Sequence, residues 1–189
     1  KALKENSQKW ATAYAGSITL GAGQFCTNPG LLVAIKGDDL NQFSEQLATA
    51  IENIPPSCML HASMQANFEK GTLKMQEQPG VSKVAQYKGE VQPNYGRQTI
   101  LKVDGSEFLK NKSLSHEVFG PFSMIVECDD ESQLIKLISE LDGQLTGTII
   151  GEDHELNQHS DVIAALQNRV GRLIFNGVPT GVEVCPAMI

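Results

Sequence analysis

The sequence predicts an α/β domain with a mainly parallel sheet flanked by helices. Segments with apolar residues at helical spacing alternate with short apolar runs through most of the chain, as in other folds of this class. The run at residues 31–35, LLVAI, is continuously apolar and therefore typical of a strand covered on both faces. A length of 189 residues suits one domain with a substantial core, so we treat residues 1–189 as a single domain.

The first predicted elements are bounded by residues that start or stop helices. Residues 4–20 are predicted to form a helix that ends at Gly21, and strand 31–35 follows it. Asp38 or Asp39 then offers an N-cap for a helix that runs to about residue 54. Apolar residues recur along this helix at helical spacing. They are Leu40, Phe43, Leu47 and Ile51.

After residue 54 the sequence predicts a helix and then irregular chain, before strands and helices alternate again. Pro55 and Pro56 end the helix, and Ser57 is predicted to cap another one over about 58–70. Residues 75–98 are polar and rich in glycine and proline, so we expect irregular surface chain there. The later predicted elements are strands at 99–103, 122–128, 145–150 and 172–175, a helix capped by Asp129 or Asp130, and a helix over about 154–169.

Charge and cysteine usage exclude several classes of protein. A formal net charge of −7 is unsuited to nonspecific binding of nucleic acid or anionic membrane, which need a basic surface. No apolar run approaches the roughly 20 residues that span a bilayer. The four cysteines are scattered and the histidines lack metal-ligand spacing, so we expect no metal site and a reducing, cytoplasmic environment. Cys58 and Cys128 are interpreted as packing residues.

Residues 21–30, GAGQFCTNPG, place Cys26 in a glycine-rich turn between the first predicted helix and the first predicted strand. Glycines reach backbone angles closed to other residues, and they leave space beside the sulfur. A nucleophilic cysteine needs such access and nearby amide donors. On these residues alone an inert, buried thiol is the alternative, because reactive cysteines are a minority.

The same ten residues resemble the catalytic-cysteine signature of the aldehyde dehydrogenase superfamily, whose core is Gly-Gln-x-Cys. Residues 116–121, HEVFGP, resemble that family's Glu-x-Phe-Gly-Pro motif, and residues 171–177, GRLIFNG, resemble its late Gly-x-x-x-x-Asn segment. Three motifs in the family order are a more specific signal than one. Residues 178–186 are most similar to the branch that includes 2,5-dioxovalerate (2-oxoglutarate semialdehyde) dehydrogenases and NADP-dependent fatty aldehyde dehydrogenases.

The resemblance implies oxidation of a small aldehyde to a carboxylic acid with NADP or NAD as cofactor, and it favours 2-oxoglutarate semialdehyde as the substrate. Cys26 would be the nucleophile. Its thiolate would add to the carbonyl, the thiohemiacetal would release hydride to the nicotinamide, and water would hydrolyse the resulting thioester. The backbone amide of Cys26 would be one oxyanion donor.

The resemblance also implies roles for residues of the two later motifs. Glu117 and Phe119 would bind the nicotinamide end of the cofactor, the carboxylate through ribose hydroxyls and the ring by packing on the nicotinamide. Without the resemblance they are interpreted as a surface carboxylate beside a core phenylalanine. Asn176 would support the geometry of the active site, and its alternative is a turn asparagine before glycine.

The resemblance covers nearly all of the chain, but the chain covers less than half of a typical family member. We therefore expect residues 1–189 to be a catalytic domain excised from a longer, homo-oligomeric enzyme. The cofactor domain, the general-base glutamate and the second oxyanion donor would then lie upstream of Lys1. The isolated fragment would have little or no dehydrogenase turnover.

Other functions remain open on the sequence. The chain could be a catalytically silent binding domain that is related to aldehyde dehydrogenases, or a thiol hydrolase or acyltransferase that pairs Cys26 with a histidine. CoA-acylating or reductive use of the same thioester is a variant within the family. Long-chain fatty aldehydes are the second substrate class.

Overall fold

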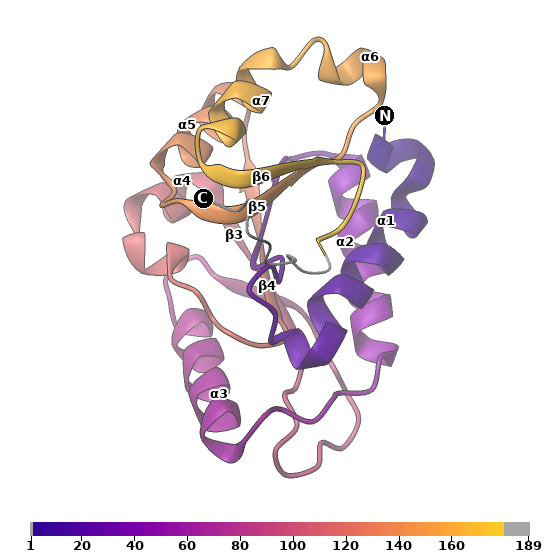
Figure 1. Cartoon of the computed structure of the whole chain (residues 1–189), viewed down its shortest axis with the longest axis vertical. Helices are drawn as coiled ribbons and strands as arrows, with labels where there is room; N and C mark the ends of the chain where they lie inside the picture. The colour runs from indigo at the N-terminus through magenta and orange to yellow at the C-terminus, as the bar shows by residue number, and fades with distance from the viewer. Residues whose placement is uncertain (1, 180–189) are drawn as a thin grey trace, which may run out of the picture.

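The computed structural model describes residues 2–179, which form a four-stranded sheet with helices on both faces and a smaller two-stranded sheet beside it (Figure 1). Cys185 and most of the segment 178–186 lie outside the described residues. The four strands lie in the order β1–β4–β3–β2. They are β1 Leu31–Ile35, β2 Ser82–Gln86, β3 Thr99–Asp104 and β4 Phe122–Cys128.

Three of these strands are parallel, as the sequence predicts. β4 pairs in parallel with β1 on one side and with β3 on the other. β2 pairs antiparallel with β3 at the edge, so the prediction of irregular chain throughout 75–98 was wrong. The sequence signal is weak there because only Ala85 is buried among the five residues of β2.

One face of the four-stranded sheet is covered by α1 Ala2–Thr19 and α2 Asp38–Asn53. The four apolar residues expected on the buried side of α2 are all buried, which confirms the helical spacing. The expected cap was wrong: Gly37 occupies the N-cap position and no side chain caps the helix. Asp38 and Asp39 lie instead in the first turn, where negative charge is favourable near the positive end of the helix dipole.

The other face is covered by α3 Ala62–Gln76, α4 Gly105–Lys110 and α5 Glu131–Glu140. α3 begins later than expected because Cys58 is extended and pairs with Tyr95 in an isolated β-bridge. Asp130 caps α5 as predicted, since its carboxylate accepts a hydrogen bond from the N–H of Gln133 at 2.8 Å. Short 3₁₀ helices, η1 Leu20–Gly23 and η2 Lys112–Ser115, complete this part of the chain.

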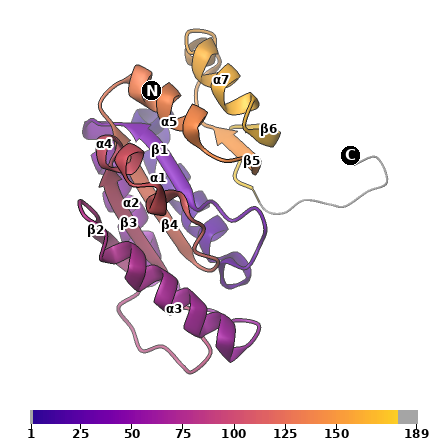
Figure 2. The ribbon, with the colours of Figure 1, turned by 90° about the vertical axis from the view of Figure 1, so that its left-hand side faces the viewer.

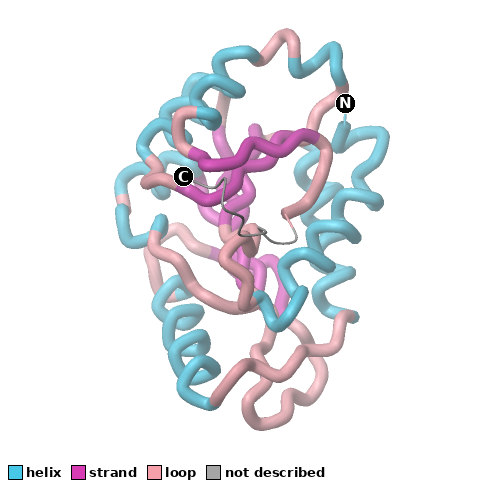
Figure 3. The backbone as a smooth tube through the Cα atoms, viewed as in Figure 1, coloured by secondary structure: helices cyan, strands magenta, loops and turns pink. Residues whose placement is uncertain are grey.

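The last part of the described chain forms a separate layer. β5 Gln144–Ile149 and β6 Val170–Phe175 form a parallel pair, which is not hydrogen-bonded to the larger sheet (Figure 3). The connection holds α6 Asp153–Leu156 and α7 Ser160–Gln167, so the single helix expected over 154–169 is broken in two. Figure 2 shows β5, β6 and α7 grouped beside the edge of the four-stranded sheet that β1 forms.

A cleft of about 1340 Å³ is lined by β1 on one side and by β5 on the other. β1 is therefore an edge strand, and its residues are partly exposed rather than covered on both faces as expected. None of the helices within residues 2–179 is long and apolar enough to cross a membrane.

Candidate active site

Strand order brings two of the sequence motifs together. The turn that holds Cys26 precedes β1, and the segment of Glu117 and Phe119 precedes β4. β1 and β4 are adjacent and parallel, with Leu31 beside Met124, so the segments that lead into them emerge at the same edge of the sheet. Cys26, Glu117 and Phe119 all line the cleft between β1 and β5.

The glycine-rich segment 21–30, called the cysteine turn below, is stabilised by hydrogen bonds between its own residues. The N–H of Gln24 donates to the carbonyl of Gly21 at 3.1 Å, and the N–H of Asn28 donates to the carbonyl of Phe25 at 3.1 Å. Gly21 and Gly23 have φ of 54° and 64°, a region that favours glycine. Ala22 between them shares this conformation with φ of 57°, so the turn is strained at one residue that is not glycine.

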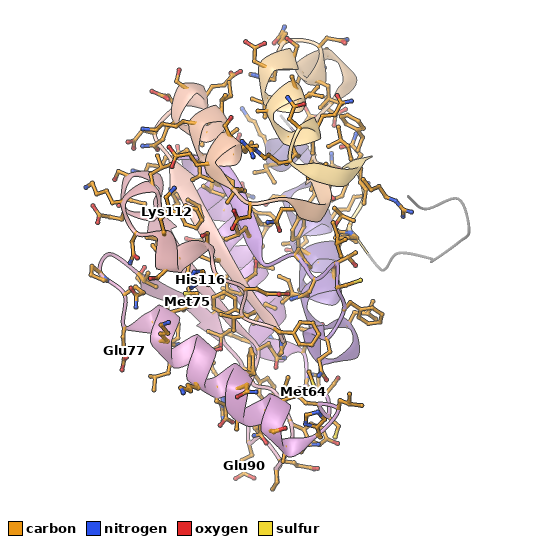
Figure 4. All side chains as sticks on the ribbon, turned by 60° about the vertical axis from the view of Figure 1, so that its left-hand side comes forward. Met64, Met75, Glu77, Glu90, Lys112 and His116 are labelled. Atoms are coloured by element: carbon orange, nitrogen blue, oxygen red, sulfur yellow. The ribbon has the colours of Figure 1, made fainter. Side chains whose placement is uncertain are left out.

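Side chains on either side of Cys26 fix the turn to its surroundings. The amide oxygen of Gln24 accepts a hydrogen bond from the N–H of Leu60 at 3.0 Å. The Gln24 amide nitrogen lies 3.1 Å from the sulfur of Met64, near the start of α3 (Figure 4). On the other side, Nδ2 of Asn28 donates to the carbonyl oxygen of Gly120 at 2.9 Å.

Cys26 itself is exposed, unlike the buried thiol that the alternative interpretation requires. In the described part of the chain no acceptor is bonded to its backbone N–H and no histidine is bonded to its sulfur. The free N–H can donate to an oxyanion that forms beside the sulfur.

The other two described cysteines lie in contrasting surroundings. Cys128 is fully buried at the end of β4, as expected of a packing residue, and burial raises the pKa of its thiol to about 11. Cys58 is exposed, so the expectation that it packs in the core was wrong. Its sulfur accepts a hydrogen bond from Nδ2 of Asn94 at 3.4 Å, within a loop beside α3 rather than inside the protein.

Glu117 and Phe119 are both exposed residues of the cleft lining. Glu117 is exposed, and Phe119 keeps 37% of its surface exposed although its neighbours Val118 and Gly120 are buried. Phe119 is therefore not the core phenylalanine of the alternative interpretation. An exposed carboxylate and an exposed ring on one cleft wall fit a ligand that offers hydroxyl groups and a flat heterocycle, as a nicotinamide nucleotide does.

Asn176 lies apart from these residues, directly after β6 and not among the residues that line the cleft. Its side-chain amide forms two hydrogen bonds with the backbone of Gly151, one from the Gly151 N–H at 3.0 Å and one to the Gly151 carbonyl at 2.9 Å. Its φ of 52° is the left-handed conformation of a turn asparagine. The amide therefore ties the ends of β5 and β6 together and has no bond to the cysteine turn.

Charged groups gather at the opposite, carboxyl edge of the sheet. Lys36 follows β1 and lies 2.5 Å from Asp104 and 2.7 Å from Asp129, so the three strand ends are joined by ion pairs. Hydrogen bonds to Asp104 and then to Asp129 raise the pKa of Lys36, and the hydrogen bond from Lys36 lowers the pKa of Asp129. Within residues 2–179 no group of three or more His, Cys, Asp or Glu side chains is placed to hold a metal ion.

Comparison with known proteins gives the same assignment as the motifs. No family model matches the chain. The chain is 37% identical over 188 residues to alpha-ketoglutaric semialdehyde dehydrogenase 2 of Azospirillum brasilense, and 34% identical over 190 residues to alpha-ketoglutaric semialdehyde dehydrogenase of Acinetobacter baylyi. Each match covers 100% of this chain and 36% of the relative.

The chain is similar in sequence to one part of these two semialdehyde dehydrogenases. It spans about a third of the length of these curated relatives. Solved aldehyde dehydrogenases share its fold: Δ-pyrroline-5-carboxylate dehydrogenase of Mycobacterium tuberculosis has a TM-score of 0.76 at 17% identity, over 94% of this chain and 34% of that one. NAD-dependent benzaldehyde dehydrogenase of Corynebacterium glutamicum has a TM-score of 0.71 at 16% identity, and the match covers 90% of this chain and 37% of that one.

Proposed function

We propose that this chain is the catalytic segment of an NAD(P)-dependent aldehyde dehydrogenase, with Cys26 as the nucleophile. The observation that carries the proposal is the exposed sulfur of Cys26, beside its own free N–H, in a cleft that Glu117 and Phe119 also line. The homology to aldehyde dehydrogenases supports the same reaction class.

The chain's residues account for the covalent half of the reaction. The Cys26 thiolate adds to the aldehyde carbon, and the carbonyl oxygen becomes an oxyanion beside the Cys26 N–H. Bound NAD(P) supplies the acceptor for the hydride that this tetrahedral carbon loses with its bonding electrons. A thioester on Sγ results, and water then adds to it and displaces the thiolate, which leaves the carboxylic acid.

Glu117 and Phe119 would hold the cofactor end that accepts the hydride. The Glu117 carboxylate is an acceptor only, so it suits the hydroxyl groups of a ribose. The Phe119 ring offers an apolar face for a flat heterocycle. Asn176 would act indirectly, because its two bonds to Gly151 fix the ends of β5 and β6 on the far side of the cleft.

The substrate is proposed from the relatives, whose names specify alpha-ketoglutaric semialdehyde. We therefore favour 2-oxoglutarate semialdehyde, with a medium-chain or long-chain aldehyde as the second candidate. The cations within the described cleft lining are few, and Lys36 is already paired with Asp104 and Asp129. A substrate carboxylate would therefore need partners other than Lys36.

The test is aldehyde oxidation by the longer protein that contains this segment. Both aldehydes are assayed with NAD and with NADP, for the unaltered protein, Cys26→Ala and Cys58→Ala. We expect Cys26→Ala to lose at least about 10³-fold in turnover, because no covalent intermediate can form. Cys58→Ala, which removes the other exposed cysteine among residues 2–179, should retain turnover. Equal activity of Cys26→Ala and the unaltered protein would disprove the proposed nucleophile.

A further inference from the structure

We propose that Asn28 is a positioning residue that holds the cysteine turn in register with the segment of Glu117 and Phe119. The role of these two residues rests on the function proposed above. The mechanical coupling rests only on contacts in the structure. The coupling acts on one peptide unit, between Gly120 and Pro121, which lies directly after Phe119.

The cysteine turn holds this peptide unit at two points. On one side, a Cβ added at Gly23 would lie 2.3 Å from the carbonyl carbon of Gly120 and 2.4 Å from the nitrogen of Pro121. Only a residue without a side chain permits this approach. On the other side, Nδ2 of Asn28 donates to the Gly120 carbonyl oxygen at 2.9 Å and lies 3.4 Å from that of Phe122. Gly23 and Asn28 flank Cys26 in the chain.

The peptide unit cannot shift easily in other directions. The Gly120 carbonyl also accepts a hydrogen bond from the N–H of Phe122 at 2.7 Å, at the entrance to β4. Gly120 has φ of 145°, and a Cβ there would meet the ring of Phe68 at 2.3 Å. Because packing blocks one side and β4 fixes the next residue, the Asn28 bond sets where the segment before Gly120 lies relative to Cys26.

Asn28 is well suited to this role and poorly explained by a simple turn role. Its backbone already closes the turn. The Asn28 N–H donates to the carbonyl of Phe25 at 3.1 Å, and the Asn28 carbonyl accepts from the N–H of Gly30 at 2.8 Å. The side chain is therefore not needed for the turn hydrogen bonds, and it reaches out to another segment of the chain. Removing its donor would leave the turn intact and leave the Gly120 carbonyl with the Phe122 N–H as its donor.

The first test uses this chain and needs no activity. Hydrogen exchange is measured over residues 117–124 and, as a reference, over α2, in the unaltered chain, Asn28→Ala and Asn28→Asp. Asn111→Ala is the matched control, because Asn111 is another partly buried asparagine whose Nδ2 donates to a distant segment, Oε1 of Gln78 at 2.8 Å, but it does not line the cleft. We expect exchange over 117–124 to rise roughly five- to tenfold in Asn28→Ala, the effect of about one hydrogen bond, with α2 unchanged.

Asn28→Asp separates positioning from a general loss of packing. At pH 8 its carboxylate would face two carbonyl oxygens, so exchange should be faster than in Asn28→Ala. The difference in exchange rate between Asn28→Asp and Asn28→Ala should decrease toward pH 6. The carbonyl oxygens favour the protonated carboxyl group, which can donate a hydrogen bond again. Exchange within twofold of the unaltered chain in Asn28→Ala would overturn the proposal, as would an equal rise in Asn111→Ala. Loss of the folded state in both Asn28 variants would also overturn it, since Asn28 would then be a folding residue.

The second test uses the longer protein and links the coupling to the cofactor. Asn28→Ala should raise the KM for NAD(P) by roughly five- to tenfold and leave the KM for the aldehyde unchanged. If the unaltered protein oxidises no aldehyde, the proposed function fails while the exchange experiment still decides the coupling. If exchange rises but the KM for NAD(P) does not change, the coupling is confirmed and the role of the segment in binding the cofactor is overturned.

Discussion

The four-stranded sheet and the β5–β6 layer differ sharply in how they are packed. The buried apolar side chains of the two core clusters, one on either face of the larger sheet, all lie at or before Ile138. α7 has no buried residue, and the residues of β5 and β6 are all partly or fully exposed. The second layer contacts the first chiefly through α5 and α7.

This difference indicates that the two sides of the proposed site, the four-stranded sheet and the β5–β6 layer, differ in rigidity. Cys26, Glu117 and Phe119 lie in the segments that lead into β1 and β4 of the larger sheet, where the close contact between Gly23 and Gly120 fixes the backbone. Asn176 belongs to the layer across the cleft. A region with few buried apolar contacts opens at a lower free energy than a close-packed one. We therefore expect the side of the cleft that holds the nucleophile to be the more stable one.

The largest expected effect is on the free energy of unfolding, and it tests the comparison directly. Leu101→Ala, at a fully buried position of β3, should lower the free energy of unfolding by about 2–5 kcal/mol, because it removes apolar contacts and leaves a cavity. Ile174→Ala, at a partly exposed position of β6, should cost about 1 kcal/mol or less. Urea denaturation of both variants measures the difference. Equal losses would mean that the two layers are equally well packed.

A pH-dependent effect on stability is expected in the larger sheet at alkaline pH. Burial raises the pKa of the Cys128 thiol from 9.0 to about 11, so between these values the unfolded chain loses a proton that the folded chain keeps. The stability that depends on this group is complete below about pH 9 and is lost as pH rises toward 11. The fall should be smaller in Cys128→Ala and unchanged in Cys58→Ala, in urea denaturation between pH 8.5 and 10.

The pH range of this experiment is chosen to exclude a second group. Burial also raises the pKa of Tyr14 from 10.0 to about 12, so Tyr14 contributes a similar loss only above pH 10. A Cys128→Ala variant with the same slope as the unaltered chain below pH 10 would show that the thiol is not desolvated.

The smallest expected effect concerns α5, which lies between the two layers. Asp130→Ala should lower the free energy of unfolding by about 1 kcal/mol, because it removes the N-cap bond to Gln133. Asp130→Asn keeps an acceptor oxygen and should cost less. Both are measured by thermal or urea denaturation. A loss in Asp130→Asn as large as in Asp130→Ala would assign the effect to charge instead of capping.

Local sequence patterns predicted most of the larger sheet. β1 and β4 have the expected bounds, and the buried residues of α2 have the expected spacing. The failures occur where contacts between distant segments decide the structure. β2 forms because β3 offers an edge, and α3 starts late because Cys58 pairs with Tyr95. The coverage of β1 was overestimated because an apolar run does not reveal a cleft beside it.

The sequence supplied candidate residues for the proposed site but not the contacts that connect them. The glycine-rich turn indicated an accessible Cys26, and the resemblance to a known family added Glu117 and Phe119. Asn28 was missed, although an asparagine two residues after the cysteine was visible in the sequence. Its role depends on Gly120, 92 positions away in the chain, and no local pattern specifies such a contact.

The central claim, that Cys26 carries the acyl group during aldehyde oxidation, is tested most directly by trapping the thioester. The longer protein is mixed with 2-oxoglutarate semialdehyde and NAD(P), quenched in acid within the first turnover, digested and analysed by mass spectrometry. The account predicts the acyl mass on the peptide that contains Cys26, only when both substrates are present, and none on the peptide of Cys58. Oxidation that proceeds with the acyl group on another residue, or with no acyl group on Cys26, would contradict it.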